Sequence, residues 1–220
     1  MKTSRELTQD GSTNEIFQEW REKATNHVEV LSPSSNRDGI LMKLQVATKS
    51  FLGTVTYNTG GLLVDHGWIR IYGSGHPRLR RDIVSWNLFQ NDQSTRQSQA
   101  LAIADDVLGG FFALNGGAFP GDQGEVYYLA PDTLEWESLG MTYTDFINWI
   151  FFGDICKFYE SLRWRNWKED VLQIESDAGF LIYPFLWAEG EELEKRARSI
   201  VPIEELWKIN QEYREKLGIV

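Results

Sequence analysis

The sequence predicts an α+β fold, in which a mixed or largely antiparallel central sheet is flanked by N-terminal and C-terminal helices. Two observations predict this class. Apolar residues recur at helical spacing near both ends of the chain, and short runs of β-branched and aromatic residues follow one another in the middle, separated by Gly, Asn and Asp. Because helices flank a strand-rich centre instead of alternating with strands, a doubly wound sheet is not expected.

The N-terminal part is expected to be helical after a flexible tail. Residues 1–11 are mostly polar or charged and are typical of a frayed end. Ser12 and Glu15 have the spacing of a helix capping box, which predicts a first helix directly after them, and a second helix is expected over residues 38–47. Residues 50–57 contain β-branched residues but precede a Thr-Gly-Gly sequence that resembles a helix C-cap, and we expect a helix there.

The centre of the chain carries the strand signals. Five short strands, each bounded by turn-forming residues, are expected at residues 62–64, 68–72, 100–104, 110–114 and 125–129. The first two are joined by a short turn, and the last three predict an antiparallel meander. Between the two groups, residues 73–98 are polar and rich in Gly, Arg, Asn and Gln, so an irregular region is expected.

Helical spacing returns at Thr142, where apolar residues at i, i+3, i+4, i+7 and i+8 predict a helix with one buried face. Gly153 is placed to end this helix and Asp154 to cap the next. Residues 180–187 are apolar but contain a proline, which favours an edge strand or a buried irregular segment. A last helix is predicted from Pro202 to Gly218, with an apolar stripe of Leu206, Ile209, Tyr213 and Leu217.

Length and composition favour one domain. The 220 residues show no break in composition, and hydrophobic residues make up 42% of them, so a single α+β domain over residues 12–220 is expected. The one cysteine, Cys156, excludes an internal disulfide. The apolar stretches are far shorter than the ~18–20 residues of a membrane span, and the N-terminus lacks the apolar core of a signal peptide, so we expect a cytoplasmic protein without membrane contact.

Negative charge is concentrated in one segment. The chain has a net charge of −10, and residues 101–160 alone hold ten acidic residues against one basic residue, Lys157. Such a field repels nucleic-acid phosphates and attracts basic partners. We therefore expect no nucleic-acid partner, and a face for a basic protein formed by Asp105, Asp106, Glu125, Asp132, Glu135 and Glu137. Surface carboxylates that only keep the chain soluble remain an equal alternative.

Sites for chemistry are sparse in the sequence. Asp65 and His66 are adjacent, as in an oriented general base, but Asp-His-Gly is also typical of a tight turn, and we prefer that interpretation. Asp105 and Asp106 match no calcium-loop spacing, so no metal or cofactor is expected. We expect a protein that is not an enzyme. The alternative is a small enzyme, or a ligand- or metal-binding protein, with a pocket near His66, Trp68 and the Asp105-Asp106 pair.

Several motifs resemble known families. Asp105-Asp-Val-Leu-Gly-Gly-Phe-Phe-Ala-Leu-Asn115, Gly124-Glu-Val-Tyr-Tyr and the step from Asp132 to Trp136-Glu resemble the signature of the SUKH superfamily. Thr59-Gly-Gly-Leu-Leu-Val-Asp-His-Gly-Trp and Ala130-Pro-Asp-Thr-Leu-Glu-Trp look like an uncharacterised bacterial family with a domain of unknown function. The second likeness runs from about Leu52 to Leu206.

The SUKH resemblance implies a SUKH-like α+β fold and a role in binding other proteins. Many members of that superfamily look like immunity proteins that neutralise toxins, often nucleases, and others are interaction modules. It carries over no catalytic residues to this sequence. Together with the acidic segment, it leads us to expect a non-enzymatic protein-binding module, such as an immunity protein whose acidic face covers a basic toxin. The oligomeric state stays open.

Overall fold

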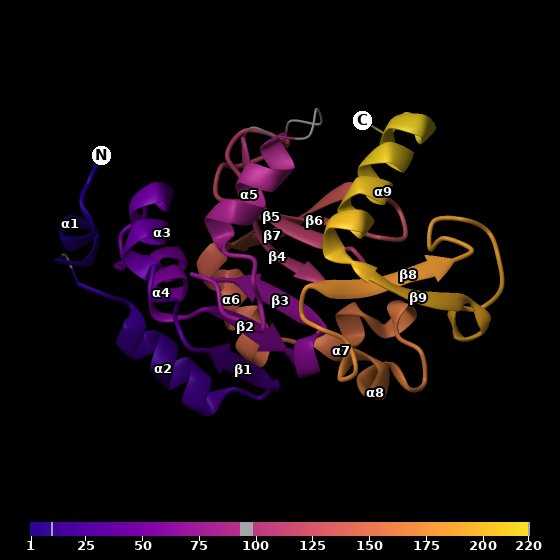
Figure 1. Ribbon diagram of the computed structural model, residues 1–220, viewed down its shortest axis with the longest axis horizontal. Coiled ribbons are helices and arrows are strands. Elements are labelled where there is room, and N and C mark those ends of the chain that lie inside the picture. The colour runs from indigo at the N-terminus through magenta and orange to yellow at the C-terminus, as the bar shows by residue number, and fades with distance from the viewer. Residues whose placement is uncertain (10, 93–98, 220) are drawn as a thin grey trace.

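A single antiparallel sheet organises the molecule. The computed structural model describes residues 1–9, 11–92 and 99–219. Seven strands lie side by side in chain order, and each pairs with its neighbours in antiparallel orientation (Figure 1). They are β1 (Val28–Leu31), β2 (Gly61–Val64), β3 (Ile69–Tyr72), β4 (Ala100–Asp106), β5 (Phe111–Asn115), β6 (Glu125–Leu129) and β7 (Trp136–Thr142). The expected α+β class and antiparallel meander are confirmed.

Helices cover both faces of the sheet, as two neighbouring residues of the interior strand β5 show. The side chains of Phe111 and Phe112 leave opposite faces because side chains alternate along a strand. Phe111 packs against Trp86 of α5 and Trp207 of α9, whereas Phe112 packs against Phe146 of α6. The helices are α1 (Ser4–Gln9), α2 (Asn14–Lys23), α3 (Arg37–Leu44), α4 (Phe51–Asn58), α5 (Ile83–Asp92), α6 (Tyr143–Phe152), α7 (Ile155–Phe158), α8 (Trp167–Val171) and α9 (Ile203–Leu217).

A separate β-hairpin leads into the last helix. Strands β8 (Ala178–Tyr183) and β9 (Ala197–Pro202) form a two-stranded sheet, and α9 follows β9 directly (Figure 1). The backbone N–H of Phe180 donates to the carbonyl of Val107 at 2.6 Å, which ties the hairpin to the turn after β4. The predicted edge-strand character of residues 180–187 is therefore confirmed for its first half.

Side-chain caps begin three of the helices that the sequence predicted. Ser50 accepts a hydrogen bond from the N–H of Gly53 and begins α4, so the helical interpretation of residues 50–57 is confirmed. Thr142 and Asp145 form a reciprocal capping box at the start of α6. Asp154 caps α7 through the N–H of Lys157, as expected.

The N-terminus differs from the prediction. Residues 4–9 of the expected tail form α1, whose Leu7 is buried and accepts a hydrogen bond from the N–H of Thr48 through its carbonyl. The predicted Ser12–Glu15 capping box is wrong, since α2 starts at Asn14, one residue later than that box requires. The Ser12 hydroxyl instead accepts from the N–H of Asn14, and it lies 3.4 Å from the hydroxyl of Thr54 on α4.

Several further elements were missed by the sequence interpretation, among them helix α8 and strand β9. Strands β1 and β7, at the two edges of the sheet, were not predicted, and the region 73–98 contains α5; its last residues, 93–98, lie outside the described residues. The start of α5 has a recognisable signal, because the Asp82 carboxylate accepts from the N–H groups of Val84 and Ser85 at 2.8 and 2.9 Å. In the part of the chain that the structure describes, no helix has the length and apolar character needed to cross a bilayer.

The last helix ends at Gly218, as predicted, but its buried face is rotated. Leu206 is buried, whereas Leu217 of the predicted stripe is 55% exposed. Asn210 and Arg214 take the inward positions because each donates a hydrogen bond to a turn carbonyl of the sheet. The buried face of α9 therefore continues from apolar residues in its first half to polar side chains that satisfy loop carbonyls in its second half.

Candidate functional site

The most distinctive polar feature is an ion cluster buried around Asp105. Asp105 lies on the central strand β4, directly opposite Arg70 of β3, and both side chains are fully buried. Arg70 Nε lies 2.5 Å from Asp105 Oδ1. The other carboxylate oxygen accepts hydrogen bonds from Arg81 Nη1 and, at 2.5 Å, from the Tyr72 hydroxyl. One carboxylate therefore holds two guanidinium groups inside the protein.

Arg81 connects this cluster to the surface. Its Nε donates to Asp177 Oδ1 at 3.0 Å and its Nη2 to the Ser176 carbonyl at 2.7 Å. Burial by itself lowers the pKa of the Arg81 guanidinium, but attraction to Asp105 and Asp177 outweighs it, and the pKa is raised. Arg70 is less well satisfied: its contact with Asp105 has no hydrogen-bond geometry, and its other nitrogens have no hydrogen-bond partner among the described residues.

Asp106 points to the opposite face of the sheet and has its own set of donors. Its Oδ1 accepts from the N–H groups of Leu108 and Gly110, both at 2.9 Å. Its Oδ2 accepts from the hydroxyls of Tyr128 at 2.7 Å and Tyr159 at 3.0 Å. Burial raises the pKa of Asp106, although these donors oppose the shift, and burial also raises the pKa of both tyrosines.

These contacts correct the sequence analysis for two residues. Asp105 and Asp106 were expected on an outward-facing acidic surface, but neither side chain is exposed. The reason is their position at the end of a central strand that has neighbours on both sides. Adjacent residues there enter opposite faces, and helices cover both faces. Both carboxylates instead organise the interior.

The other four predicted partner-binding carboxylates lie on β6, on β7 and in their connection. Asp132, Glu135 and Glu137 are exposed and lie close together in the chain at the β6–β7 turn, whereas the half-buried Glu125 starts β6 at the other end of the strand. We call Asp132, Glu135 and Glu137 the acidic turn. Within the described chain, none of its carboxylates lies within 4.0 Å of a basic group.

His66 and Trp68 are not brought together with this surface. Trp68 is fully buried, with its ring centroid 5.5 Å from that of Tyr159. His66 stacks on His27 with ring centroids 4.3 Å apart, and burial together with the charge of His27 lowers its pKa. The neighbouring Asp65 lies 2.5 Å from Arg163 Nη2, an ion pair that engages its carboxylate.

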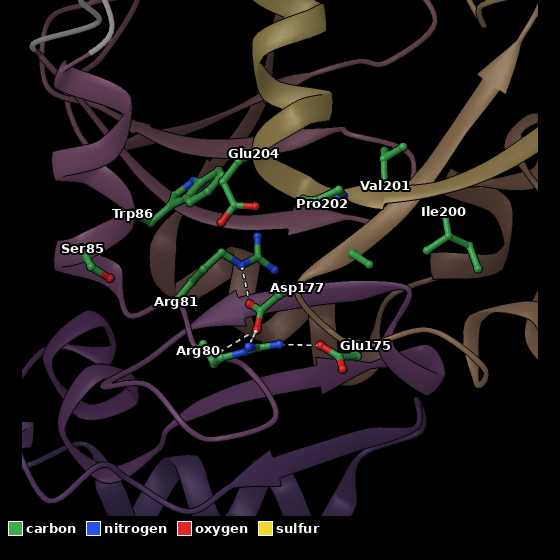
Figure 2. Close-up of a pocket in the computed structure, with 11 residues that line it drawn as sticks. Arg80, Arg81, Ser85, Trp86, Glu175, Asp177, Ile200, Val201, Pro202 and Glu204 are labelled. Atoms are coloured by element: carbon green, nitrogen blue, oxygen red, sulfur yellow. Dashed lines mark hydrogen bonds and ion pairs between the residues drawn. The ribbon is translucent and has the colours of Figure 1, made fainter.

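A surface pocket of about 570 Å³ lies between α5, the hairpin and the start of α9 (Figure 2). Figure 2 shows Arg81 and Trp86 on one side, Arg80 with Asp177 and Glu175 along another, and the hairpin residues opposite. The lining residues are Arg80, Arg81, Ser85, Trp86, Glu175, Asp177, Ala178, Ile200, Val201, Pro202 and Glu204. Neither His66 nor Trp68 lines this pocket, but Asp105 lies directly behind it through its contact with Arg81.

Charges in the pocket are unevenly compensated. Arg80 contacts both Glu175 and Asp177, and Arg81 contacts Asp177 in addition to the buried Asp105. Glu204, in the first turn of α9, has no ion pair or hydrogen bond with another side chain in the described ranges. The pocket therefore carries one uncompensated negative charge on its rim. Nowhere in the described residues do three or more His, Cys, Asp or Glu side chains form a group that could hold a metal ion.

Sequence reasoning missed Arg70, Arg81, Asp177 and Glu204. One signal was available: Arg70 is the single charged residue in an otherwise apolar strand, and such a residue needs a buried partner of opposite charge. The Asp105-Asp106 pair at the end of another strand supplies that partner. No comparable signal marks Asp177, because its role depends on how the segment before β8 folds against Arg81.

Comparison with known proteins places the chain in a family. A family model described as a protein of unknown function, DUF2625, matches residues 5–206. The chain belongs to the DUF2625 family. The match confirms the predicted likeness to a family with a domain of unknown function and extends it to the N-terminal helices, whereas the finer SUKH relationship stays a prediction.

Two bacterial relatives cover nearly all of this DUF2625 chain. The uncharacterized protein YbfG of Escherichia coli (strain K12) is 47% identical over 201 residues, which span 91% of each chain. An uncharacterized protein of Haemophilus influenzae (strain ATCC 51907 / DSM 11121 / KW20 / Rd) is 35% identical over 223 residues, spanning 100% of this chain and 98% of the relative. The likeness therefore extends over nearly all of this chain.

Proposed function

We propose that this DUF2625 protein is a non-enzymatic protein-binding module whose acidic turn engages a basic partner. The observation that carries this proposal is the exposure of Asp132, Glu135 and Glu137 without a basic group in ion-pair contact within the described chain. Exposed carboxylates gathered on one surface speed the encounter with a basic protein and fix its orientation.

The neighbouring strand supports this mode of binding. β7 is the last strand of the sheet, and in the part of the chain that the structure describes it pairs only with β6. Glu137 and Ser138 on this strand are exposed. An edge strand with free main-chain groups can accept an extended segment of a partner, and the adjacent carboxylates favour a basic one.

A charge-reversal experiment tests the proposal. The immobilised protein is incubated with bacterial lysate at about 50 mM salt, and the retained basic protein is purified and titrated against the wild type. The triple variant Asp132→Lys/Glu135→Lys/Glu137→Lys is expected to weaken the Kd at least about tenfold, since it turns attraction into repulsion. Binding is also expected to weaken at about 500 mM salt.

A control variant with the same change in net charge shows whether binding depends on the acidic turn itself or only on the total charge of the protein. Glu189, Glu191 and Glu192 are exposed in the connection between β8 and β9 and do not belong to the acidic turn. Their reversal to Lys should leave the Kd within about twofold. Retention of no partner, or equal losses in both triple variants, would contradict the proposal.

The finer part of the proposal is that the partner is a basic toxin and that the protein acts in the cytoplasm as a SUKH-like immunity protein. Its support is the resemblance of the motifs that begin at Asp105, Gly124 and Asp132 to the SUKH signature. Expression of a toxin encoded beside the gene should arrest growth of a strain lacking this protein, and co-expression should restore it. Rescue by the triple charge-reversal variant equal to that by the wild type would count against this role.

A further inference from the structure

The pocket between α5, the hairpin and α9 has the volume of a small-molecule site. Its volume of about 570 Å³ falls within the range of about 300–1,000 Å³ that is typical of ligand pockets. Its wall combines an apolar side with a few polar groups, the composition that such sites share. It is formed by other residues than the acidic turn, so an inference about it is independent of the function proposed above.

Charge compensation decides what the pocket can attract. The two arginines in its wall, Arg80 and Arg81, are each held by two carboxylates. Their positive charge is therefore already balanced inside the protein, and the Nε, Nη1 and Nη2 atoms of Arg81 each already donate a hydrogen bond. An anionic ligand would have to compete with these carboxylates.

Glu204 is the group that lacks such compensation. It projects from the first turn of α9, and Figure 2 shows its carboxylate directed toward the space between Trp86 and Arg81. Within the described ranges no lysine or arginine lies in ion-pair distance of it. A cation that entered the pocket would form an ion pair there, with part of the water excluded by the surrounding walls.

The hairpin supplies the apolar side. Ile200, Val201 and Pro202 line the pocket from β9, and Ile200 is 61% exposed. A flat or aliphatic ligand body lying on these residues would remove this apolar surface from water.

We propose that the pocket binds a small organic cation, an amidine, guanidine or amine with an apolar body. The cationic group pairs with Glu204, and the body packs on Ile200 and Pro202. A planar amidinium or guanidinium group fits best, because it can donate two parallel hydrogen bonds to one carboxylate.

Three probes of the same shape and different charge test this inference. Benzamidine is cationic, benzamide neutral and benzoate anionic at neutral pH. Benzamidine is expected to bind the full-length protein with a Kd on the order of 1 mM, as small fragments do, and to raise its melting temperature. Benzamide should bind at least about tenfold more weakly, and benzoate should not bind at concentrations that saturate benzamidine.

The carboxylate is tested with a matched pair of variants. Glu204 and Glu205 occupy the same helical turn, but only Glu204 lines the pocket. Glu204→Gln should weaken benzamidine binding at least about tenfold, whereas Glu205→Gln should leave it within about twofold. Ile200→Ser should weaken it by a smaller factor, because it removes only part of the apolar contact.

Three outcomes would overturn the inference. The first is the absence of benzamidine binding in calorimetry and in ligand-observed NMR. The second is a preference for benzoate, which would make the pocket an anion site. The third is equal binding by the wild type and Glu204→Gln, which would place the cation elsewhere on this acidic protein. Because the acidic turn is not involved, the triple charge reversal there should leave benzamidine binding unchanged.

Discussion

Two groups of carboxylates from the same acidic segment have opposite environments. Asp105 and Asp106, on the central strand β4, are fully buried, and each is surrounded by hydrogen-bond donors or guanidinium groups. The three carboxylates of the acidic turn are exposed beside the edge strand β7. The difference shows that strand position decides whether an acidic residue serves the interior or the surface. A central strand removes both faces from water, while a turn beside an edge strand leaves its side chains solvated.

The largest expected effect is the loss of Asp105. Asp105→Ala should lower the free energy of unfolding by about 3–5 kcal/mol, because Arg70 and Arg81 would remain buried without their shared carboxylate. Urea unfolding measures this loss. A variant that also replaces Arg70 by Met should recover part of it, since one buried charge is removed. A loss below about 1 kcal/mol would show that water reaches the cluster.

Removal of Asp106 is expected to cost somewhat less. Asp106→Ala should lower the free energy of unfolding by about 2–4 kcal/mol, because it leaves two N–H groups and two tyrosine hydroxyls without their acceptor. Tyr128→Phe and Tyr159→Phe should each cost about 1 kcal/mol. If either phenylalanine variant lost as much free energy of unfolding as Asp106→Ala, the tyrosine hydroxyl and not the carboxylate would be the main stabilising group.

The raised pKa of Asp106 predicts the sign of a pH effect. Burial raises its pKa above the value of 3.8 expected in the unfolded chain, so the folded state binds the proton more tightly. The contribution of Asp106 to stability is therefore full below pH 3.8 and is lost as the pH rises through the folded-state pKa. Between pH 3.8 and the folded-state pKa, the free energy of unfolding of the wild type should fall relative to that of Asp106→Asn. At higher pH the difference between the two proteins should stay constant. Unfolding curves at several pH values test this, and a relative gain would contradict it.

His66 provides a smaller pH effect of opposite sign. Its pKa is lowered from 6.5 by burial and by the neighbouring His27, so protonation favours the unfolded chain. Stability is full above pH 6.5 and is lost as the pH falls toward the folded-state pKa. His66→Asn should remove this loss, and Asn tolerates the positive φ of 65° at this position. Equal pH profiles for the two proteins would contradict the prediction.

The smallest expected effect lies at the acidic turn. Glu135→Ala should change the free energy of unfolding by no more than about 0.5 kcal/mol, because the side chain is exposed. Urea unfolding measures this change, and the Asp105→Ala variant, unfolded in the same assay, shows the size of a large loss. A large loss here would mean that Glu135 stabilises the fold and is not reserved for a partner.

The central part of the fold could be predicted because its signals are local. Turn residues between short apolar runs placed β2 to β6, the Thr-Gly-Gly sequence after residue 58 placed α4, and the cap at Asp154 placed α7. Strand β7 was missed because its residues alternate only weakly and include Gly140, which adopts a positive φ of 62°. Strand β1 and helix α1 are short, and contacts with distant segments stabilise them, as the bond between Leu7 and Thr48 shows.

The candidate site was less predictable than the fold. The acidic segment was visible as composition, and its exposed part could be located once the β6–β7 turn was known. The pocket could not be anticipated, because Arg81, Asp177 and Glu204 come from three segments separated by many residues. They become neighbours only because the fold brings α5, the hairpin and α9 together.

The sequence by itself determined the α+β class, the antiparallel central strands, the family and the segment in which negative charge gathers. Each of these follows from local periodicity, turn chemistry or composition. Only the tertiary structure decided which carboxylates are buried and where a pocket opens. Burial in the central strands requires helices over both faces of the sheet, and one of these helices, α9, comes from a part of the chain far from β4 and β5.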